Sequence, residues 1–322
     1  MQNKIFSIQK KEQFEKLALE MFDYQMKNNQ TYAQYATLLL KGNRPKNIIE
    51  IPFLPIHFFK TKKIICKERD VEQIFLSSGT LGEQSKHLIS DIEIYKKSFT
   101  TSFNLFYGDT TQYCILSLLP NYREREGSSL IYMIDDLIKK SNNKNSGFYL
   151  NKYEKLAKML TELEAKEQKT ILFGVSYALL DLANQFPQKL KNTIIIETGG
   201  MKGKRKEMLK EELHNKLKSA FSLLKIHSEY GMTELLSQSY SKGDGIFQPP
   251  PWKRILIRDI KDPLSIIGDN KIGGINIIDL ANIYSCPFIA TEDIGKRFEN
   301  TTFKISGRLD NSELRGCNLL IE

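Results

Sequence analysis

Hydrophobic residues change their spacing along this chain, and each change predicts a different kind of element. Residues 1–45 carry apolar side chains at helical spacing among Lys, Glu and Gln, which predicts amphipathic helices. From about residue 91 to residue 221, short apolar runs alternate with segments of helical spacing. The runs at 113–119, 170–173 and 193–196 predict strands, and the segments at 91–106, 130–138, 153–166, 176–185 and 204–221 predict helices. Such alternation predicts an α/β fold, a mostly parallel sheet with helices on both faces.

The pattern changes again after residue 241. Short strands are expected near 255–258, 275–279 and 303–305, with Gly, Asp and Pro between them. We therefore expect an α/β core over residues 1–240, which includes the helical N-terminal segment. A smaller β-rich subdomain over residues 241–322 would end in a short tail.

One apolar segment matches neither the helical spacing nor the short apolar runs of the predicted strands. Residues 51–60 read IPFLPIHFFK, with two prolines three residues apart. Proline lacks an N–H group and restricts the residue before it, so this spacing prevents a regular helix and favours an extended path. The many apolar side chains indicate that this path is buried or lines a pocket.

Composition excludes several classes of protein. The chain has 322 residues, a hydrophobic content of 41% and a net charge of +9. Its lysines alternate with glutamates, which favours a solvated surface over a nucleic-acid-binding face. The four cysteines form no CxxC pair and no cluster with histidine, so neither a zinc site nor a disulfide framework is expected. We find no signal-peptide pattern and no apolar run of membrane-spanning length, and we expect a cytoplasmic protein.

The stretch 74–87, IFLSSGTLGEQSKH, is the first candidate for chemistry. A short apolar run ends abruptly in small, hydroxylated residues and glycines. Glycines let the backbone turn its N–H groups toward an anion, and hydroxyls add donors, which is the chemistry of a phosphate-binding loop. The candidate phosphate-binding residues are Ser77, Ser78, Gly79, Thr80, Gly82 and Lys86. The spacing matches neither GxxxxGK[ST] nor GxGxxG, and an ordinary turn after a strand is the alternative interpretation.

Three further stretches follow this loop in a fixed order: YGMTE at 230–234, TEDIG at 291–295 and GRLDNSELRG at 307–316. Together the four stretches resemble the adenylate-forming superfamily of acyl-CoA synthetases, luciferases and peptide-synthetase adenylation domains. The proline-containing segment 51–60 narrows the resemblance to the acyl-protein synthetases. These are the ligase components of bacterial fatty-acid reductases that make aldehyde for luminescence. The resemblance implies the adenylate-forming large-domain fold, here without a C-terminal lid domain.

The resemblance also implies roles for individual residues. The Ser/Gly loop would hold the β- and γ-phosphates of ATP. Thr233 would contact the α-phosphate, and Glu234 would bind Mg²⁺, which prefers oxygen ligands. Contacts to adenine and ribose are expected from Gly199, Gly200, Tyr230, Gly231, Asp293 and Arg308. The apolar residues expected to line an acyl pocket are Phe173, Gly174, Val175 and Tyr177.

The implied reaction has two steps. A carboxylic acid, expected to be a fatty acid, would be activated by ATP to an acyl adenylate, and a thiol would then displace AMP. Most of the superfamily continues into a lid that carries a catalytic lysine, whereas only residues 317–322 follow the last stretch here. Its GRxD…RG spacing is also one residue short of the usual pattern. Acyl-protein synthetases have their acyl-accepting cysteine near the C-terminus, and Cys317 occupies that place.

Two other functions are compatible with the same stretches. One is an acyl- or aryl-CoA ligase related to phenylacetate-CoA ligase. The other is a nucleotide-binding scaffold with reduced catalysis. In the preferred interpretation, a partner resembling acyl-CoA reductases, or a carrier protein, would receive the acyl group. The chain itself has no nicotinamide-binding fingerprint.

Overall fold

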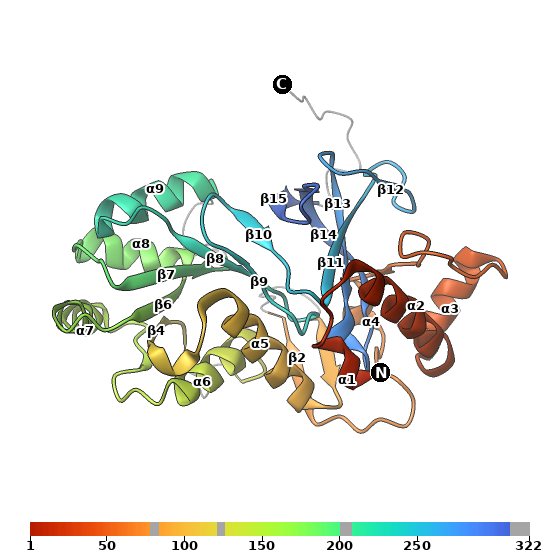
Figure 1. Cartoon of the computed structure of the whole chain (residues 1–322), viewed down its shortest axis with the longest axis horizontal. Helices are drawn as coiled ribbons and strands as arrows, with labels where there is room; N and C mark the ends of the chain where they lie inside the picture. Colours follow the sequence, from red (N-terminus) through yellow and green to blue (C-terminus); the bar gives the residue numbers. More distant parts are fainter. Residues whose placement is uncertain (78–83, 121–125, 200–207, 310–322) are drawn as a thin grey trace. The chain divides into compact units, whose positions relative to one another are not determined.

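The computed structural model describes residues 1–77, 84–120, 126–199 and 208–309. It confirms the α/β class and divides the chain into two compact units (Figure 1). One unit combines Met1–Arg69 with Pro251–Glu322, and the other comprises Asp70–Pro250. The division into domains at residues 240 and 241 stays a prediction.

The Asp70–Pro250 unit is built on a parallel sheet with the strand order β5-β4-β6-β7-β8. Strands β4 and β6 are buried at every position, as expected for parallel strands covered on both faces. The strands are β4 (Cys114–Leu118), β5 (Gly147–Phe148), β6 (Thr170–Val175), β7 (Thr193–Thr198) and β8 (His227–Tyr230). The predicted strands at 113–119, 170–173 and 193–196 are therefore confirmed.

Four further strands of this unit are antiparallel. Strands β9 (Ser239–Ser241) and β10 (Ile246–Gln248) continue the sheet beyond β8. Strands β2 (Gln73–Leu76) and β3 (Lys86–Ile89) form a separate hairpin, in which Phe75 lies opposite His87. The sequence pattern predicted the first strand of this hairpin but not its return strand.

Helices cover both faces of the parallel sheet, with α8 and α9 on one face and α5 and α6 on the other (Figure 1). The helices are α5 (Ile92–Tyr107), α6 (Ser129–Ser141), α7 (Tyr153–Ala165), α8 (Ser176–Gln185) and α9 (Lys210–Phe221), with a 3₁₀ turn at Thr110–Gln112. The Asp91 side chain accepts the N–H groups of Glu93 and Ile94 and so begins α5. Helix α9 begins at Lys210, later than the residue 204 that its spacing predicted.

The Met1–Arg69 and Pro251–Glu322 unit is rich in antiparallel strands. Its strand order is β12-β11-β13-β14-β15, and β1 runs parallel to β14. The strands are β1 (Leu54–Pro55), β11 (Lys253–Arg258), β12 (Ile266–Ile267), β13 (Ile272–Asp279), β14 (Phe288–Arg297) and β15 (Phe303–Arg308). The helices are α1 (Gln2–Ile5), α2 (Lys11–Asn28), α3 (Gln30–Leu40) and α4 (Phe58–Thr61), with a 3₁₀ turn at Leu280–Asn282. The predicted β-rich character and N-terminal helices are confirmed.

The proline-containing segment 51–60 is extended and largely buried over its first half, as predicted. Leu54 and Pro55 pair with Ile289 and Ala290 of β14, and the Tyr32 hydroxyl donates to the Pro52 carbonyl at 2.8 Å. The segment then enters the single turn α4, which the prediction of an extended path did not include. Within the described residues, no helix is both long and apolar enough to cross a membrane.

Candidate active site

The two ends of the Ser/Gly loop are joined at the tip of the β2–β3 hairpin. The Ser77 N–H donates to the Ser85 carbonyl at 3.1 Å, and the Ser85 N–H donates to Ser77 Oγ at 2.9 Å. Gln84 Nε2 also donates to the Ser77 carbonyl, at 2.9 Å. The hairpin therefore brings residues 77 and 85 together and defines where the loop leaves and rejoins the fold. Lys86 follows as an exposed residue.

Several predicted site residues lie outside the described parts of the chain. They are Ser78, Gly79, Thr80, Gly82, Gly200 and Cys317.

The turn after β8 carries the predicted catalytic pair Thr233 and Glu234, and it contacts the hairpin. Thr233 Oγ1 donates to the Leu76 carbonyl at 3.4 Å, on the residue that precedes the loop. The Thr233 carbonyl lies 2.8 Å from Nδ1 of His87 on β3. The Glu234 side chain is 5% exposed. Two stretches that are about 150 residues apart in the sequence are thus brought together within one unit.

The predicted adenine-binding residues of this unit lie at the ends of β7 and β8. Tyr230 is the last residue of β8, is partly exposed and is followed by Gly231. The Tyr230 ring centroid is 5.8 Å from that of Phe247 on β10. Gly199 follows β7 with a φ of 72°, a left-handed conformation that favours glycine. These positions agree with ligand binding beyond the carboxyl ends of parallel strands.

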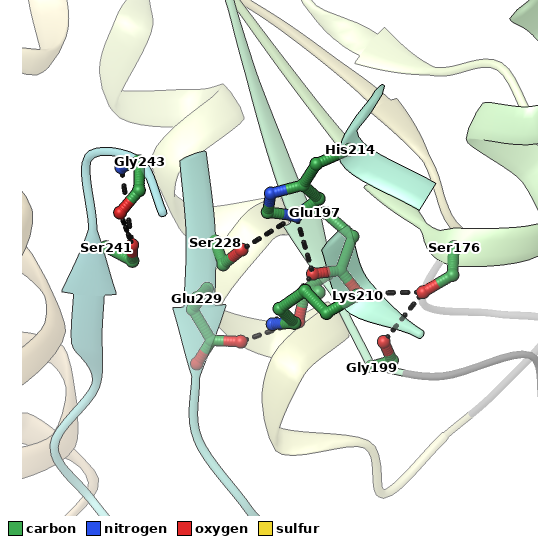
Figure 2. A network of polar contacts seen from close by, with 10 residues as sticks. Ser176, Glu197, Gly199, Lys210, His214, Ser228, Glu229, Ser241 and Gly243 are labelled. Carbon is green, nitrogen blue, oxygen red and sulfur yellow. Dashed lines mark hydrogen bonds and ion pairs between the residues drawn. The ribbon is translucent and has the colours of Figure 1, made fainter. Parts of the chain in front are cut away.

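A buried carboxylate lies beside the Gly199 turn (Figure 2). Glu197, near the end of β7, is 2% exposed, and its Oε1 accepts the Ser176 hydroxyl at 2.7 Å. Its Oε2 lies 3.1 Å from Lys210 Nζ and 3.9 Å from His214 Nε2. The Ser176 oxygen is also 2.9 Å from the Gly199 carbonyl, so this network reaches the turn itself.

The charge of Glu197 follows from this arrangement. Burial alone raises the pKa of its carboxyl group. His214, Lys210 and Ser176 outweigh burial, so the pKa lies below its usual value and the group is ionised at neutral pH. A serine hydroxyl has a single proton to donate. Ser176 donates it to Glu197 rather than to the Gly199 carbonyl, because the contact with Glu197 is shorter and its acceptor is charged.

A second polar contact joins β7 and β8 in the same region. The Thr198 hydroxyl donates to Glu229 Oε2 at 2.6 Å, and both residues are buried. The Lys210 ammonium also lies 5.0 Å from the centroid of the Phe247 ring, which in turn contacts Tyr230. Lys210 at the start of α9, Phe247 on β10 and Tyr230 at the end of β8 therefore form a continuous set of contacts.

Asp293 and Arg308 belong to the other unit, where they lie opposite each other on β14 and β15. Arg308 Nε is 3.8 Å from Asp293 Oδ1, and the Arg308 side chain is 69% exposed. The Asp293 N–H donates to Thr291 Oγ1 at 3.1 Å. Within its unit, each of the two residues therefore has the other as an ion-pair partner.

The predicted acyl-pocket residues lie at the end of β6 and the start of α8. Phe173 and Val175 are buried among core side chains, and Tyr177 is partly exposed. Gly174 lies close to Leu179, where an added Cβ would come within 2.7 Å of the Leu179 Cγ atom. Their role in binding an acyl chain stays a prediction.

The three described cysteines are buried, and their thiols are less reactive than exposed thiols. Burial raises the pKa of Cys66 and of Cys114 to about 11, and raises that of Cys286 further. Because the thiolate is the reactive form, these thiols are poor nucleophiles at neutral pH.

Sequence patterns missed four residues of this region: His87, Ser176, Glu197 and Lys210. A single histidine or serine forms no motif that a sequence pattern could identify. Glu197 offered one usable signal, because it is a charged residue at the end of the buried run TIIIET, directly before Thr198 and Gly199. Buried charges require partners, so this position is a signal that could have indicated a polar network.

Solved structures of adenylate-forming enzymes share this fold. ATP-bound MatB from Rhodopseudomonas palustris matches with a TM-score of 0.56 and 19% identity over 74% of this chain and 48% of that chain. The O-succinylbenzoate coenzyme A synthetase MenE from Bacillus subtilis, solved with AMP, matches with a TM-score of 0.51 and 16% identity over 77% and 51%. This chain thus spans about half the length of these structures.

Sequence comparisons extend over nearly the whole chain. The long-chain-fatty-acid–luciferin-component ligase of Aliivibrio fischeri is 24% identical over 336 residues, which cover 97% of this chain and 88% of that protein. The family model described as acyl-protein synthetase, LuxE, matches residues 4–322. The chain belongs to the LuxE family of acyl-protein synthetases, which are ligases.

Proposed function

We propose that this chain activates a fatty acid with ATP and then transfers the acyl group to a cysteine thiol. The observation that carries the proposal is the junction between the β2–β3 hairpin and the Thr233 turn. At this junction, the start of the Ser/Gly loop, whose composition suits phosphate binding, meets the Thr233–Glu234 turn. Thr233 offers a hydroxyl for the α-phosphate, and Glu234 offers a carboxylate for a metal ion. Family membership over residues 4–322 supports the same chemistry.

The first step is an in-line displacement at the α-phosphorus of ATP. A carboxylate oxygen of the acid forms a bond to this phosphorus, the bond to the bridging oxygen of the β-phosphate breaks, and pyrophosphate leaves. The protein contributes mainly by positioning the reactants and neutralising charge. The loop from Ser77 to Gly82 and Lys86 would hold the leaving phosphates. The Thr233 hydroxyl would turn from the Leu76 carbonyl to donate to the α-phosphate when ATP is bound.

A magnesium ion fits the donor set of this turn. In the described parts of the chain no three His, Cys, Asp or Glu side chains gather as a ready-made metal site. Mg²⁺ commonly takes one or two protein carboxylates and completes its shell with phosphate oxygens and water. Glu234 would supply the carboxylate. The bound ion would neutralise the charge of the leaving pyrophosphate.

The contacts to adenine and ribose are those that the family pattern implies. Tyr230 would stack on adenine, with Gly199, Gly200 and Gly231 allowing a close approach of the backbone. The carboxylate of Asp293 would accept the ribose hydroxyls. Arg308 would lie near the ribose or the phosphates.

In the second step, a thiolate attacks the acyl carbonyl carbon. The bond from that carbon to the AMP oxygen breaks, AMP leaves, and the thiol proton passes to solvent. We assign the thiol to Cys317, because the three other cysteines are buried and their pKa values are raised. The acyl group would then pass to a reductase-like or carrier partner.

Intact-mass measurement tests this proposal. The protein is incubated with Mg-ATP and saturated fatty acids from octanoate to hexadecanoate, without coenzyme A. We expect an acyl adduct that neutral hydroxylamine removes and that Cys317→Ala lacks. ATP–pyrophosphate exchange should persist in Cys317→Ala, because adenylation precedes the thiol step.

Three results would contradict the proposal. An unchanged adduct in Cys317→Ala would refute the assignment of the thiol. The absence of both adduct and pyrophosphate exchange with every acid would refute acid activation and favour a nucleotide-binding scaffold. Exchange without an adduct, followed by thioester formation on added coenzyme A, would instead identify a coenzyme A ligase.

A further inference from the structure

His87 is a fully buried histidine at the end of the stretch 74–87, but it is not one of the candidate phosphate-binding residues. Its side chain is 0% exposed on β3, one residue after Lys86. Its Nδ1 lies 2.8 Å from the carbonyl oxygen of Thr233. A carbonyl oxygen can only accept, so Nδ1 carries a proton and donates it.

The imidazole is neutral under ordinary conditions. Burial lowers the pKa of His87 to about 4, although the hydrogen bond to Thr233 opposes the shift. A neutral ring with its proton on Nδ1 is a fixed donor and carries no charge toward the phosphates. It touches the backbone of Thr233 and is therefore suited to holding that backbone in place.

Thr233 is held by both strands of the hairpin. Its carbonyl accepts from His87 on β3, and its hydroxyl donates to the Leu76 carbonyl on β2. In the hairpin register, Leu76 lies opposite Lys86 and Phe75 lies opposite His87, so the two contacts come from adjacent pairs. These bonds relate the Thr233–Glu234 turn to the base of the Ser/Gly loop.

We propose that His87 is a positioning residue that fixes the Thr233–Glu234 turn against the β2–β3 hairpin, so that Thr233 and Glu234 keep their place relative to Ser77 and Lys86 when ATP binds. This inference rests on the proposed function. His87 itself does not contact substrate or transfer a proton. Without its donor, the turn would lose the shorter of these two bonds to the hairpin. Small displacements of catalytic groups lower rates strongly, and a shift of about 1 Å can cost roughly 100-fold.

Substituting His87 by each of the two amide residues tests whether it acts through its Nδ1 donor or only by filling space. In His87→Asn, the side-chain amide places a donor near the position of Nδ1. In His87→Gln, the amide is one bond further out, near the position of Nε2, and the Nδ1 donor is lost. His87→Leu removes both ring nitrogens at similar size. His227→Asn is the matched control, because His227 is another histidine of this unit with a pKa lowered to about 4.

The readout is fatty-acid-dependent ATP–pyrophosphate exchange, measured below the unfolding temperature of each variant. We expect His87→Asn and His227→Asn to keep kcat within about threefold of the wild type. His87→Gln and His87→Leu should lose about 10- to 100-fold in kcat with a smaller change in KM for ATP. If His87→Leu does not fold, the comparison of Asn with Gln still decides.

The outcomes distinguish this inference from the proposed function. An active wild type with equal kcat in the Asn and Gln variants would overturn the positioning role. So would a loss of activity in both variants that follows their loss of folded protein. A wild type without exchange would overturn the proposed function, and the positioning role would fall with it.

Discussion

The ammonium group of Lys210 lies 3.1 Å from the carboxylate of Glu197, and the two side chains differ greatly in exposure. The side chain of Glu197 is 3% exposed and that of Lys210 is 40% exposed. The buried anion therefore depends on a cation that remains in contact with solvent. Ser176 and His214 complete its surroundings, so the carboxylate stays ionised at the end of β7 (Figure 2).

Replacing Lys210 by Met should destabilise the protein at neutral pH. The change leaves the Glu197 carboxylate without its ion-pair partner, and the expected loss in the free energy of unfolding is about 1–2 kcal/mol, reduced by solvent screening. Lys216→Met is the matched control on α9, because the Lys216–Glu212 pair is exposed on both sides. The control should change stability by less than about 0.5 kcal/mol in urea unfolding.

This effect of Lys210 should also depend on pH. The folded pKa of Glu197 lies below its unfolded value, so its stabilising contribution is present above the unfolded pKa and is lost as the pH falls through the folded pKa. In Lys210→Met the folded pKa rises. The difference between wild type and variant should therefore shrink on acidification. A difference that stays constant as the pH is lowered until the wild type itself unfolds would contradict the role of Glu197.

The hydrogen bond from Ser176 to Glu197 can be measured separately with a double-mutant cycle. Ser176→Ala removes the donor, and Glu197→Gln removes the charge while keeping the size of the side chain. We expect Ser176→Ala to cost about 1–2 kcal/mol, as is common for hydrogen bonds to charged groups. The cycle should give a coupling energy of about 1 kcal/mol. Additive effects of the two substitutions would show that the contact contributes no specific stabilisation.

Acid should weaken the fold through His87, which is fully buried, and His227, which is partly buried. Burial lowers the pKa of His87 and of His227 to about 4, whereas an unfolded histidine titrates near 6.5. The unfolded chain thus binds more protons between these values, so stability falls as the pH decreases from about 6.5 to about 4. At pH 5 the expected loss is on the order of 1–2 kcal/mol for each histidine.

His87→Asn tests this pH dependence, because asparagine does not titrate. Its urea-unfolding free energy should decrease less between pH 7 and pH 5 than that of the wild type. An identical decrease in both proteins would show that His87 does not titrate as its burial requires.

Gly295 lies at a close approach between strands. A Cβ atom at this position would lie 2.3 Å from the Lys304 carbonyl oxygen on β15, where the register of the β14–β15 pair shifts. Gly295→Ala must move the backbone of one strand, with an expected cost of about 1–3 kcal/mol. Gly307→Ala in the same strand pair is the control, because a Cβ there meets no atom within 4 Å. Equal thermal unfolding temperatures for the two variants would contradict this explanation of the glycine in TEDIG.

The local sequence pattern predicted those strands that have the same surroundings on both faces. Strands β4 and β6 are buried on both faces, so their continuous apolar runs were sufficient to identify them. Strand β14 was missed because Thr291, Glu292 and Asp293 interrupt its apolar residues. Strand β3 was missed because its four residues pair with β2, and that pairing depends on where the Ser/Gly loop ends.

The sequence by itself determined the family, the α/β class and the stretches expected to bind nucleotide, because motif composition and apolar spacing are local properties. Only the tertiary structure decided which of these stretches meet within a unit and what holds them. The contact of His87 with Thr233 spans 146 residues, and that of Ser176 with Glu197 joins a helix to a strand across 21 residues. Hydrogen bonds of this kind depend on the packing of distant elements, and no spacing in the chain specifies them.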